Sequence, residues 1–371
     1  MIEKTPARPS LDLRRFETRK RSHLDLALRP EVEATEITDL RQIRLEHDAL
    51  PEFDFAEVRL ATPFGKGSSK RELATPFFVS GMTAGHASAT MLNRRLAAAC
   101  ARRGWIFGVG SQRRELDPAL PAIDAWAGLK SESPDLVVLG NLGISQAITE
   151  PVANVQRLAK NAEADAFCIH LNALQEVFQP EGTPAFKGGV AALKKLATKL
   201  GLPLVLKETG CGLSRRTLAK IRALPLAAVD VSGLGGTHWG RIEGLRAAEE
   251  GESVRARAAE TFAEWGVSTV ESVRAAAEIL PKTTEVWASG GVRTGLDAAK
   301  LIALGATRVG FAKPALEAAL AGEAELDRWM ETVEFELRTA LFCTGNRAPA
   351  ELRGTLAASK ARSAKTKRSR R

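Results

Sequence analysis

Two glycine-containing loops in the last third of the chain have the composition of phosphate-binding loops. The first reads Ser-Gly-Gly-Val-Arg-Thr-Gly at residues 289–295, and the second reads Gly-Phe-Ala-Lys-Pro at residues 310–314. Glycines let backbone N–H groups approach an anion, and the N-terminus of a following helix favours negative charge. Arg293 and Lys313 add one positive side chain to each loop. Together the two loops predict a site for a phosphate group.

Polar and charged side chains also end six other apolar segments of the chain. Lys207 is the most informative, because a charge in such a segment is costly unless it meets an anion or an electron-rich ring. Alternatively, Lys207 pairs with the neighbouring Glu208, and His170 could be a hydrogen-bonded structural residue. The full set is Gly81, Met82, Thr83, Ser111, Gln112, Arg113, Asn141, His170, Asn172, Lys207, Glu208, Ser232 and Gly233.

The apolar segments that carry these side chains have the pattern of parallel strands. Each is a short continuous apolar run, as expected for a strand buried on both faces, and helical patterns lie between them. Eight such units favour an α/β fold of the closed (β/α)8 barrel type, a TIM barrel, over a doubly wound sheet. The runs cover residues 76–80, 105–110, 136–140, 166–170, 203–207, 227–231, 285–289 and 307–312, with helical patterns at 89–103, 190–200, 214–224, 270–280 and 295–304.

In this barrel, active sites lie at the carboxyl ends of the strands, so we expect all the polar ends to line one mouth. Between the sixth and seventh strands, residues 233–265 are longer than a connection needs and include a charged helical insert at 241–264. A long insert on a strand-to-helix loop is typical of a lid or a substrate wall. The pattern therefore predicts an enzyme with a partly covered active site.

The chain divides into three parts on composition. Residues 1–75 form an N-terminal extension that is polar and helix-prone up to residue 40, with a hairpin expected from the alternating segment 55–60 and the turn at 65–69. Residues 76–345 form the barrel, and residues 346–371 form a basic tail that we expect to be disordered. Residues 352–371 carry eight Lys or Arg and no acid, so residues 1–351 carry only 9 − 8 = +1. The net charge of +9 therefore indicates a solvated tail and no specific nucleic-acid partner.

Composition also indicates a soluble cytoplasmic protein. The chain is 44% hydrophobic, but no apolar run approaches the roughly 20 residues of a membrane span, and residues 1–21 lack the apolar core of a secretion signal. The four cysteines are scattered, without metal-ligand spacing, which fits a reducing compartment. We therefore expect no membrane partner.

Taken in order, the motifs resemble those of type 2 isopentenyl-diphosphate isomerases, the FMN-dependent kind, from about Arg19 to about Phe342. No single motif is specific enough, but the ordered set is. It comprises Arg19-Lys20 with His23; Gly81-Met82-Thr83; residues 108–113; Asn141-Leu142-Gly143; His170-Leu171-Asn172 with Gln175-Glu176 and residues 179–182; Lys207-Glu208; residues 230–233 with Gly235-Gly236-Thr237; and residues 289–295.

The resemblance implies interconversion of isopentenyl and dimethylallyl diphosphate in isoprenoid biosynthesis, with reduced FMN, Mg²⁺ and NADPH as the reductant. It also implies that the flavin itself carries the proton, and that the enzyme forms a homo-oligomer, a tetramer or an octamer. The implied FMN-binding residues are Gly81, Met82, Thr83, Ser111, Asn141, Lys207, Ser232, Thr237, Gly291, Val292, Arg293, Ala312 and Lys313. The implied substrate-binding residues are Arg19, Lys20, His23, Ser111, Gln112, Arg113 and Gln175. His170, Asn172 and Gln175 would have catalytic or positioning roles, and Glu176 would bind the metal.

Three alternatives remain at this point. An FMN-dependent 2-hydroxyacid oxidase requires a histidine base beside an arginine after the sixth strand, and His238 is a poor substitute. An inosine-monophosphate-type dehydrogenase requires a nucleophilic cysteine in that loop, and none lies between Ser232 and Trp265. The third is a non-catalytic flavin- or phosphate-binding scaffold. The chain departs from the family pattern at Ala84, where the family has glycine, and neither Cys211 nor His238 has an assigned role.

Overall fold

The computed structural model describes residues 22–34, 39–65, 70–83, 89–117, 126 and 128–357. Arg19, Lys20, Ala84 and the last 14 residues of the basic tail lie outside the described residues, so the predictions made for them stay predictions. None of the helices described there is both long enough and apolar enough to cross a membrane.

Eight parallel strands close into a barrel, which confirms the predicted fold class. The strands follow one another around the barrel in chain order, and the last pairs with the first. Nine strand residues, among them Phe78, Val137 and Trp287, fill the interior of the barrel together with Phe64 and Leu73 from outside it. The strands are β3 (Phe77–Val79), β4 (Ile106–Gly108), β5 (Val137–Gly143), β6 (Ala166–His170), β7 (Leu204–Lys207), β8 (Ala228–Asp230), β9 (Glu285–Ala288) and β10 (Arg308–Phe311).

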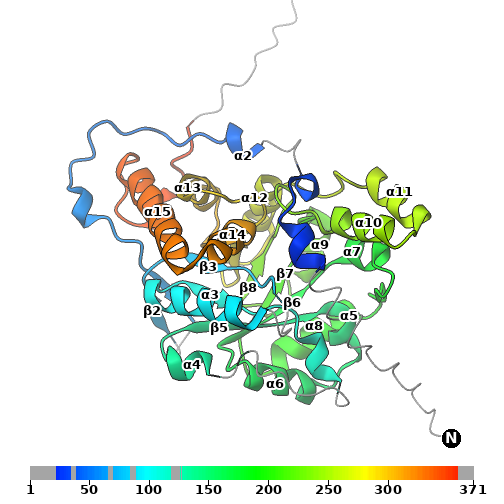
Figure 1. Ribbon diagram of the computed structural model, residues 1–371. Coiled ribbons are helices and arrows are strands. Elements are labelled where there is room, and N and C mark those ends of the chain that lie inside the picture. The colour runs from blue at the N-terminus through cyan, green and yellow to red at the C-terminus, as the bar shows by residue number, and fades with distance from the viewer. Residues whose placement is uncertain are drawn as a thin grey trace, which may run out of the picture.

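The helices surround the strands, as Figure 1 shows. Their starts follow ordinary capping chemistry: Ser214, Ser268 and Thr294 each accept a backbone N–H at the start of a helix. The helices are α2 (Asp39–Gln42), α3 (Thr90–Arg103), α4 (Leu129–Glu132), α5 (Ile144–Thr149), α6 (Val152–Asn161), α7 (Ala173–Phe178), α8 (Gly189–Lys199), α9 (Arg215–Ile221), α10 (Trp239–Glu249), α11 (Ser253–Thr261), α12 (Thr269–Ile279), α13 (Gly295–Ala303), α14 (Lys313–Ala321) and α15 (Glu323–Phe342), with short 3₁₀ turns at η1 (Pro30–Val32), η2 (Phe55–Glu57), η5 (Gln112–Leu116) and η6 (Pro349–Leu352).

A two-stranded hairpin covers the amino-terminal end of the barrel. Its strands are β1 (Thr62–Phe64) and β2 (Arg71–Leu73), which pair antiparallel. The expected first strand at residues 55–60 is wrong, because η2 forms there instead: Asp54 and Glu57 make a capping box that favours a helical turn. Phe64 packs with the side chains of the barrel interior. The hairpin therefore closes the end of the barrel opposite to the expected active site.

The opposite end is covered by two segments distant in sequence. Residues 22–34, which we call the strap, lie against the insert that contains α10 and α11. Val32 O accepts the His238 N–H at 2.8 Å, Gly236 O accepts the Ala34 N–H at 2.9 Å, and Leu26 and Val32 pack on Ile242 of α10. The strap and the insert thus form one wall over the carboxyl ends of the strands.

Candidate active site

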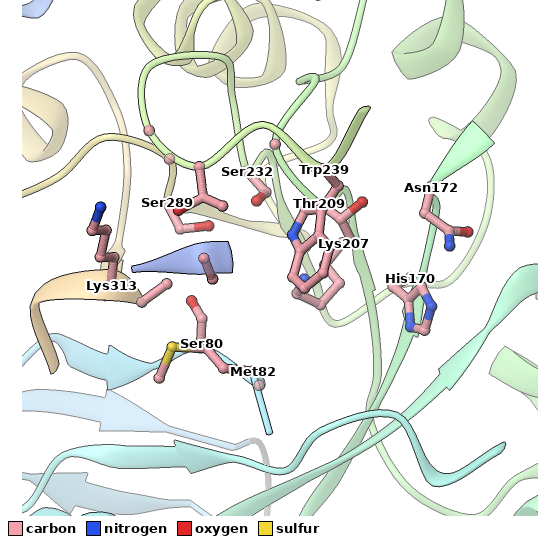
Figure 2. Close-up of a pocket in the computed structure, with 18 of the residues that line it drawn as sticks. Ser80, Met82, His170, Asn172, Lys207, Thr209, Ser232, Trp239, Ser289 and Lys313 are labelled. Carbon is pink, nitrogen blue, oxygen red and sulfur yellow. The ribbon is translucent and has the colours of Figure 1, made fainter. Parts of the chain in front are cut away.

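A cavity of ≈ 410 Å³ lies at the carboxyl ends of the strands, between the barrel, the strap and the insert. In Figure 2, Lys313 and Met82 lie on one side of it and His170 and Asn172 on the other. Of the predicted site and strand-end residues that the structure describes, three lie outside the lining, namely Gln112, Glu208 and Gly233. The others line the cavity: His23, Gly81, Met82, Thr83, Ser111, Arg113, Asn141, His170, Asn172, Gln175, Glu176, Lys207, Ser232, Thr237, Gly291, Val292, Arg293, Ala312 and Lys313.

Gln112 does not face the cavity, and its expected contact with substrate stays a prediction. Its side chain is 1% exposed and lies beneath the loop, where Nε2 donates to Leu158 O at 2.9 Å and Oε1 accepts the Asn141 N–H at 3.1 Å. Glu115, which Trp126 holds at 2.9 Å, accepts a further bond from Nε2. The amide of Gln112 is therefore used to fix the neighbouring strand end, because a polar group placed under the loop must satisfy its own hydrogen bonds.

The two glycine-containing loops form a cradle of backbone. Gly290 and Gly291 have φ angles of 101° and 74°, and a Cβ there would lie 2.0 Å from Gly233 O and 2.1 Å from Gly235 O respectively. Only glycine fits both the conformation and the space. Among the described residues, the N–H groups of Gly291 and Val292 donate to no acceptor, so they are available to an anion.

Glu33, which the sequence analysis did not single out, completes the cation arrangement at this cradle. Its carboxylate contacts the side chains of both Arg293 and Lys313. Burial raises the pKa of Glu33, but the hydrogen bond and charge of Lys313 and the charge of Arg293 outweigh burial and hold the pKa below its ordinary value. The residue lies 260 positions before Arg293, so no local signal marks it.

Lys207 projects into the cavity from the end of β7. Its ammonium group donates to the carbonyl oxygen of Glu208 at 2.9 Å and makes no other hydrogen bond within the described residues, although an ammonium has three donors. The expected alternative, a pairing with the Glu208 carboxylate, is not what forms. That carboxylate instead accepts the N–H groups of Thr209, Cys211 and Gly212 at 2.6, 2.5 and 3.0 Å. Lys207 is therefore left with donors for a bound group.

The Glu208 carboxylate organises the loop after β7. Burial raises its pKa to about 7, although the three backbone donors and the Lys207 charge act in the opposite direction. Nearby, Asp230 is 1% exposed and accepts from Ser289 Oγ at 2.8 Å. Burial raises the pKa of Asp230 too, with Lys207 lowering it. Lys207 thus lies near two buried acidic groups, Glu208 and Asp230, whose carboxylates already accept hydrogen bonds within the protein.

On the other side of the cavity, His170 and Glu176 are held by asparagines. His170 Nδ1 and Asn141 Oδ1 are 2.8 Å apart. Glu176 is 6% exposed, so it is not a solvated carboxylate, and it accepts from Asn172 Nδ2 at 2.9 Å. Asn172 Oδ1 is buried and has no hydrogen-bond partner within the described residues. A buried amide oxygen without a donor and a buried carboxylate are both ligand types that Mg²⁺ accepts.

These oxygens are not part of a larger ligand cluster. Within residues 22–357, apart from the undescribed gaps, no three His, Cys, Asp or Glu side chains lie close enough to hold a metal ion. Mg²⁺ usually keeps several waters and is bound through one or two carboxylates and substrate phosphates. Glu176 alone is therefore a sufficient protein carboxylate for a metal that is shared with a diphosphate.

The insert contributes Glu243, the most consequential residue that sequence reasoning missed. It is 0% exposed on α10 and accepts from His23 Nε2 at 2.8 Å, Gln175 Nε2 at 3.2 Å and Arg246 Nη1 at 2.6 Å. Burial raises the pKa of Glu243, but the charges of His23 and Arg246 and the hydrogen bond from His23 lower it to about 2. The ring of Trp239 meets that of His23 edge to face, with centroids 5.2 Å apart. The insert therefore positions two predicted substrate residues.

His238 has a structural role. It is 0% exposed, its Nδ1 accepts the Arg241 N–H at 3.2 Å, and it caps α10. Its Nε2 lies 3.2 Å from Trp265 O and 3.7 Å from Cys211 Sγ. Burial lowers the pKa of His238, which favours the neutral ring. The residue does not line the cavity and cannot be the base that a hydroxyacid oxidase would require.

Comparisons with known proteins agree with this geometry. Residues 141–359 match the FMN-dependent dehydrogenase family. A protein of Legionella pneumophila (strain Corby) named isopentenyl-diphosphate delta-isomerase is 47% identical over 338 residues, which are 91% of this chain and 96% of that protein. One of Bdellovibrio bacteriovorus with the same name is 45% identical over 90% of this chain and 94% of its own.

Among solved structures, a lactate oxidase of Pediococcus acidilactici has a TM-score of 0.62 at 15% identity, covering 94% of this chain and 96% of its own. A mandelate oxidase mutant with an FMN adduct has a TM-score of 0.60 at 19% identity, covering 91% of each chain. At such identities the likeness concerns the fold alone. The sequence relatives and the barrel of this protein therefore show that it is an enzyme of the FMN-dependent, type 2 isopentenyl-diphosphate delta-isomerase family.

Proposed function

We propose that this protein interconverts isopentenyl diphosphate and dimethylallyl diphosphate by a 1,3-shift of the double bond, as part of isoprenoid biosynthesis. The observation that carries the proposal is that a single cavity contains both a phosphate cradle and a second group of anion-binding side chains. The names of the relatives support the same activity. A cofactor phosphate and a substrate diphosphate can then be bound together.

The proposed FMN site comprises the thirteen cavity residues implied by the family resemblance. The N–H groups of Gly291 and Val292 would hold the phosphate, with Arg293 and Lys313 supplying charge. Lys207, with donors to spare in the middle of the cavity, would hydrogen-bond the flavin ring. Gly81 of this site has no room for a side chain, because a Cβ there would lie 2.2 Å from Val109 O and 2.9 Å from Asn141 Nδ2.

The proposed diphosphate site uses Arg113, Ser111, His23 and Gln175, together with Arg19 and Lys20, which lie outside the described residues. Arginine forks and lysine charges complement a diphosphate. Glu176, with Asn172 Oδ1 beside it, would hold the Mg²⁺ that neutralises part of the substrate charge. His23 and Gln175 are held in place by Glu243, so the substrate meets prearranged donors.

Proton movement needs a donor and an acceptor close to the reacting carbons. The described side chains that line the cavity offer no pair of acids arranged for that task, and His170 and Asn172 are tied to Asn141 and Glu176. Reduced FMN, when bound, would supply the group that gives and takes the proton. The protein's part is to orient substrate over the ring and to exclude water, through the strap and the insert.

NADPH serves as the reductant of the flavin, because the family resemblance implies it. The enzyme works in the cytoplasm as a homo-oligomer, a tetramer or octamer, and needs neither a membrane nor a nucleic acid. The scattered, partly buried cysteines fit the reducing compartment.

Turnover tests the proposal directly. Purified protein is incubated anaerobically with isopentenyl diphosphate, FMN, Mg²⁺ and NADPH, omitting each component in turn. We expect dimethylallyl diphosphate to form only with reduced flavin and Mg²⁺, without stoichiometric consumption of NADPH. Bound FMN without product would refute the isomerase and favour the non-catalytic flavin-binding scaffold.

A further inference from the structure

The two cations of the phosphate cradle are already paired with a carboxylate of the protein itself. Lys313 Nζ lies 2.6 Å from Glu33 Oε1, and the Arg293 guanidinium contacts Glu33 Oε2. One carboxylate oxygen therefore serves each cation. Glu33 also lines the cavity, so its charge faces the place where an anion would bind.

Glu33 is held there by the backbone of the strap. The residue pairs antiparallel with Thr237, and its neighbours on both sides exchange hydrogen bonds with the loop before α10. Lys313 Nζ donates to Arg29 O as well, at 3.2 Å, so the strap contacts this lysine at two points. The buried Val32 fixes the preceding position. The backbone of the strap therefore holds Glu33 beside the two cations.

A phosphate and a carboxylate compete for the same partners. The phosphate of FMN carries two negative charges, and its natural ligands at this cradle are the free N–H groups together with Arg293 and Lys313. A Glu33 carboxylate beside those cations either must be displaced or must stay as a like charge within a few ångströms, and both outcomes weaken phosphate binding.

We propose that Glu33 competes with the phosphate of FMN for the same cations. Its carboxylate occupies Arg293 and Lys313 until FMN binds. The inference rests on the proposed FMN site. Its consequence is that the affinity for FMN is set below what the cations and N–H groups would give alone. Flavin binding and the seating of the strap are then linked, because both use the same two cations.

The test compares two flavins on two variants of the full chain. Flavin is removed, and FMN or riboflavin, which lacks the phosphate, is titrated while flavin fluorescence is followed. Glu33→Gln removes the competing charge. Glu31→Gln, on the same strap, is the matched control, because its exposed carboxylate lies 3.8 Å from Arg29 and forms no other ion pair within the described part of the chain. Circular dichroism checks that each variant is folded, and Glu33→Ser provides a second substitution.

We expect Glu33→Gln and Glu33→Ser to bind FMN about tenfold more tightly than the wild type, as one removed like charge at close range allows. Riboflavin affinity and all Glu31→Gln affinities should match the wild type. If the wild type prefers FMN to riboflavin but neither Glu33 variant tightens FMN binding, the competition is refuted while the cofactor site stands. If the wild type binds the two flavins equally, the proposed phosphate site itself is wrong, and the inference fails with it.

Discussion

The two ends of this barrel contain the same kinds of charged residue in opposite states. At the amino-terminal end, Asp165 is shared by Arg71 at 2.7 Å and Lys130 at 2.8 Å. Arg308, 1% exposed, lies over the rings of Phe64 and Trp287 and donates to Thr62 Oγ1 at 3.1 Å. These charged groups are paired within the fold, and Arg308 Nε, which donates no hydrogen bond among the described residues, still lies 3.4 Å from Glu285 Oε2.

At the carboxyl-terminal end, polar and charged groups keep hydrogen-bonding capacity that the described residues do not use. Lys207 makes one hydrogen bond within the described residues, and the N–H groups of Gly291 and Val292 make none there. The comparison teaches that residue type does not separate structural charges from functional ones. The remaining hydrogen-bonding capacity separates the two groups, because folded proteins leave few buried donors unpaired.

The largest expected effect follows from removing a buried charge at the amino-terminal end of the barrel. Arg308→Leu should lower the free energy of unfolding by about 4 kcal/mol, because it leaves the oxygens of Thr62 and Pro63 without a donor and breaks the pair with Glu285. FMN affinity of the folded fraction should not change. Urea unfolding measures the first and flavin titration the second. The exposed pair of Arg102 with Asp327 provides the control, and Arg102→Leu should change stability by less than about 1 kcal/mol. A weakened FMN affinity in Arg308→Leu would mean that the two ends are not independent.

The next effect concerns the buried carboxylate after β7. Burial raises the pKa of Glu208 from 4.5 to about 7, so its contribution is fully present below pH 4.5 and is lost as pH rises through 7. Over that window the flavin-free wild type should lose about 3 kcal/mol more stability than Glu208→Gln, which cannot titrate. Urea midpoints measured at several pH values test this, and parallel curves for the two proteins would contradict it.

At the mouth, Lys207→Ala should give a colourless protein that binds FMN about 100-fold more weakly, because a charge-assisted hydrogen bond is lost. Lys130→Ala is the matched control at the other end, where the ammonium is engaged by Asp165. That variant should stay yellow. The absorbance ratio of flavin to protein after desalting measures both, and equal flavin loss in the two variants would sink the distinction between the ends.

The smallest of the four effects sharpens the division within the mouth. Glu176→Gln should keep its flavin but lower turnover at limiting Mg²⁺ about 30-fold, because it removes one metal carboxylate and leaves the cradle intact. Glu181→Gln, whose carboxylate pairs with Arg246 nearby, should behave as the wild type. A Mg²⁺ titration of the initial rate distinguishes them. Full activity of Glu176→Gln at low Mg²⁺ would remove the metal assignment.

The barrel could be predicted because buried parallel strands are uninterrupted apolar runs, and all eight runs became strands. The hairpin was misplaced at its first strand, since alternation in residues 55–60 is equally compatible with the capped turn that forms. The strand-end residues were predictable as a group, because one barrel end collects them.

The contacts of Glu243, Glu33 and Gln112 could not be predicted from the sequence. A glutamate in a charged helix looks solvated until a histidine 220 positions away is placed beside it. The same holds for Glu33 and its distant cations. Gln112 was expected among the substrate residues on the strength of its neighbours in the motif, and only the packing shows that its amide turns inward.

The interlocked glycines have a consequence for how this enzyme can change over time. A Cβ on Gly290 would lie 2.0 Å from Gly233 O, one on Gly291 would lie 2.1 Å from Gly235 O, and one on Gly236 would lie 2.6 Å from the Gly291 nitrogen. At these three positions, one loop can gain a side chain only if the other loop moves away in the same step. Single substitutions at these glycines are therefore not expected to be tolerated during evolution. Anyone redesigning the barrel for a different cofactor should transplant the two loops as one unit.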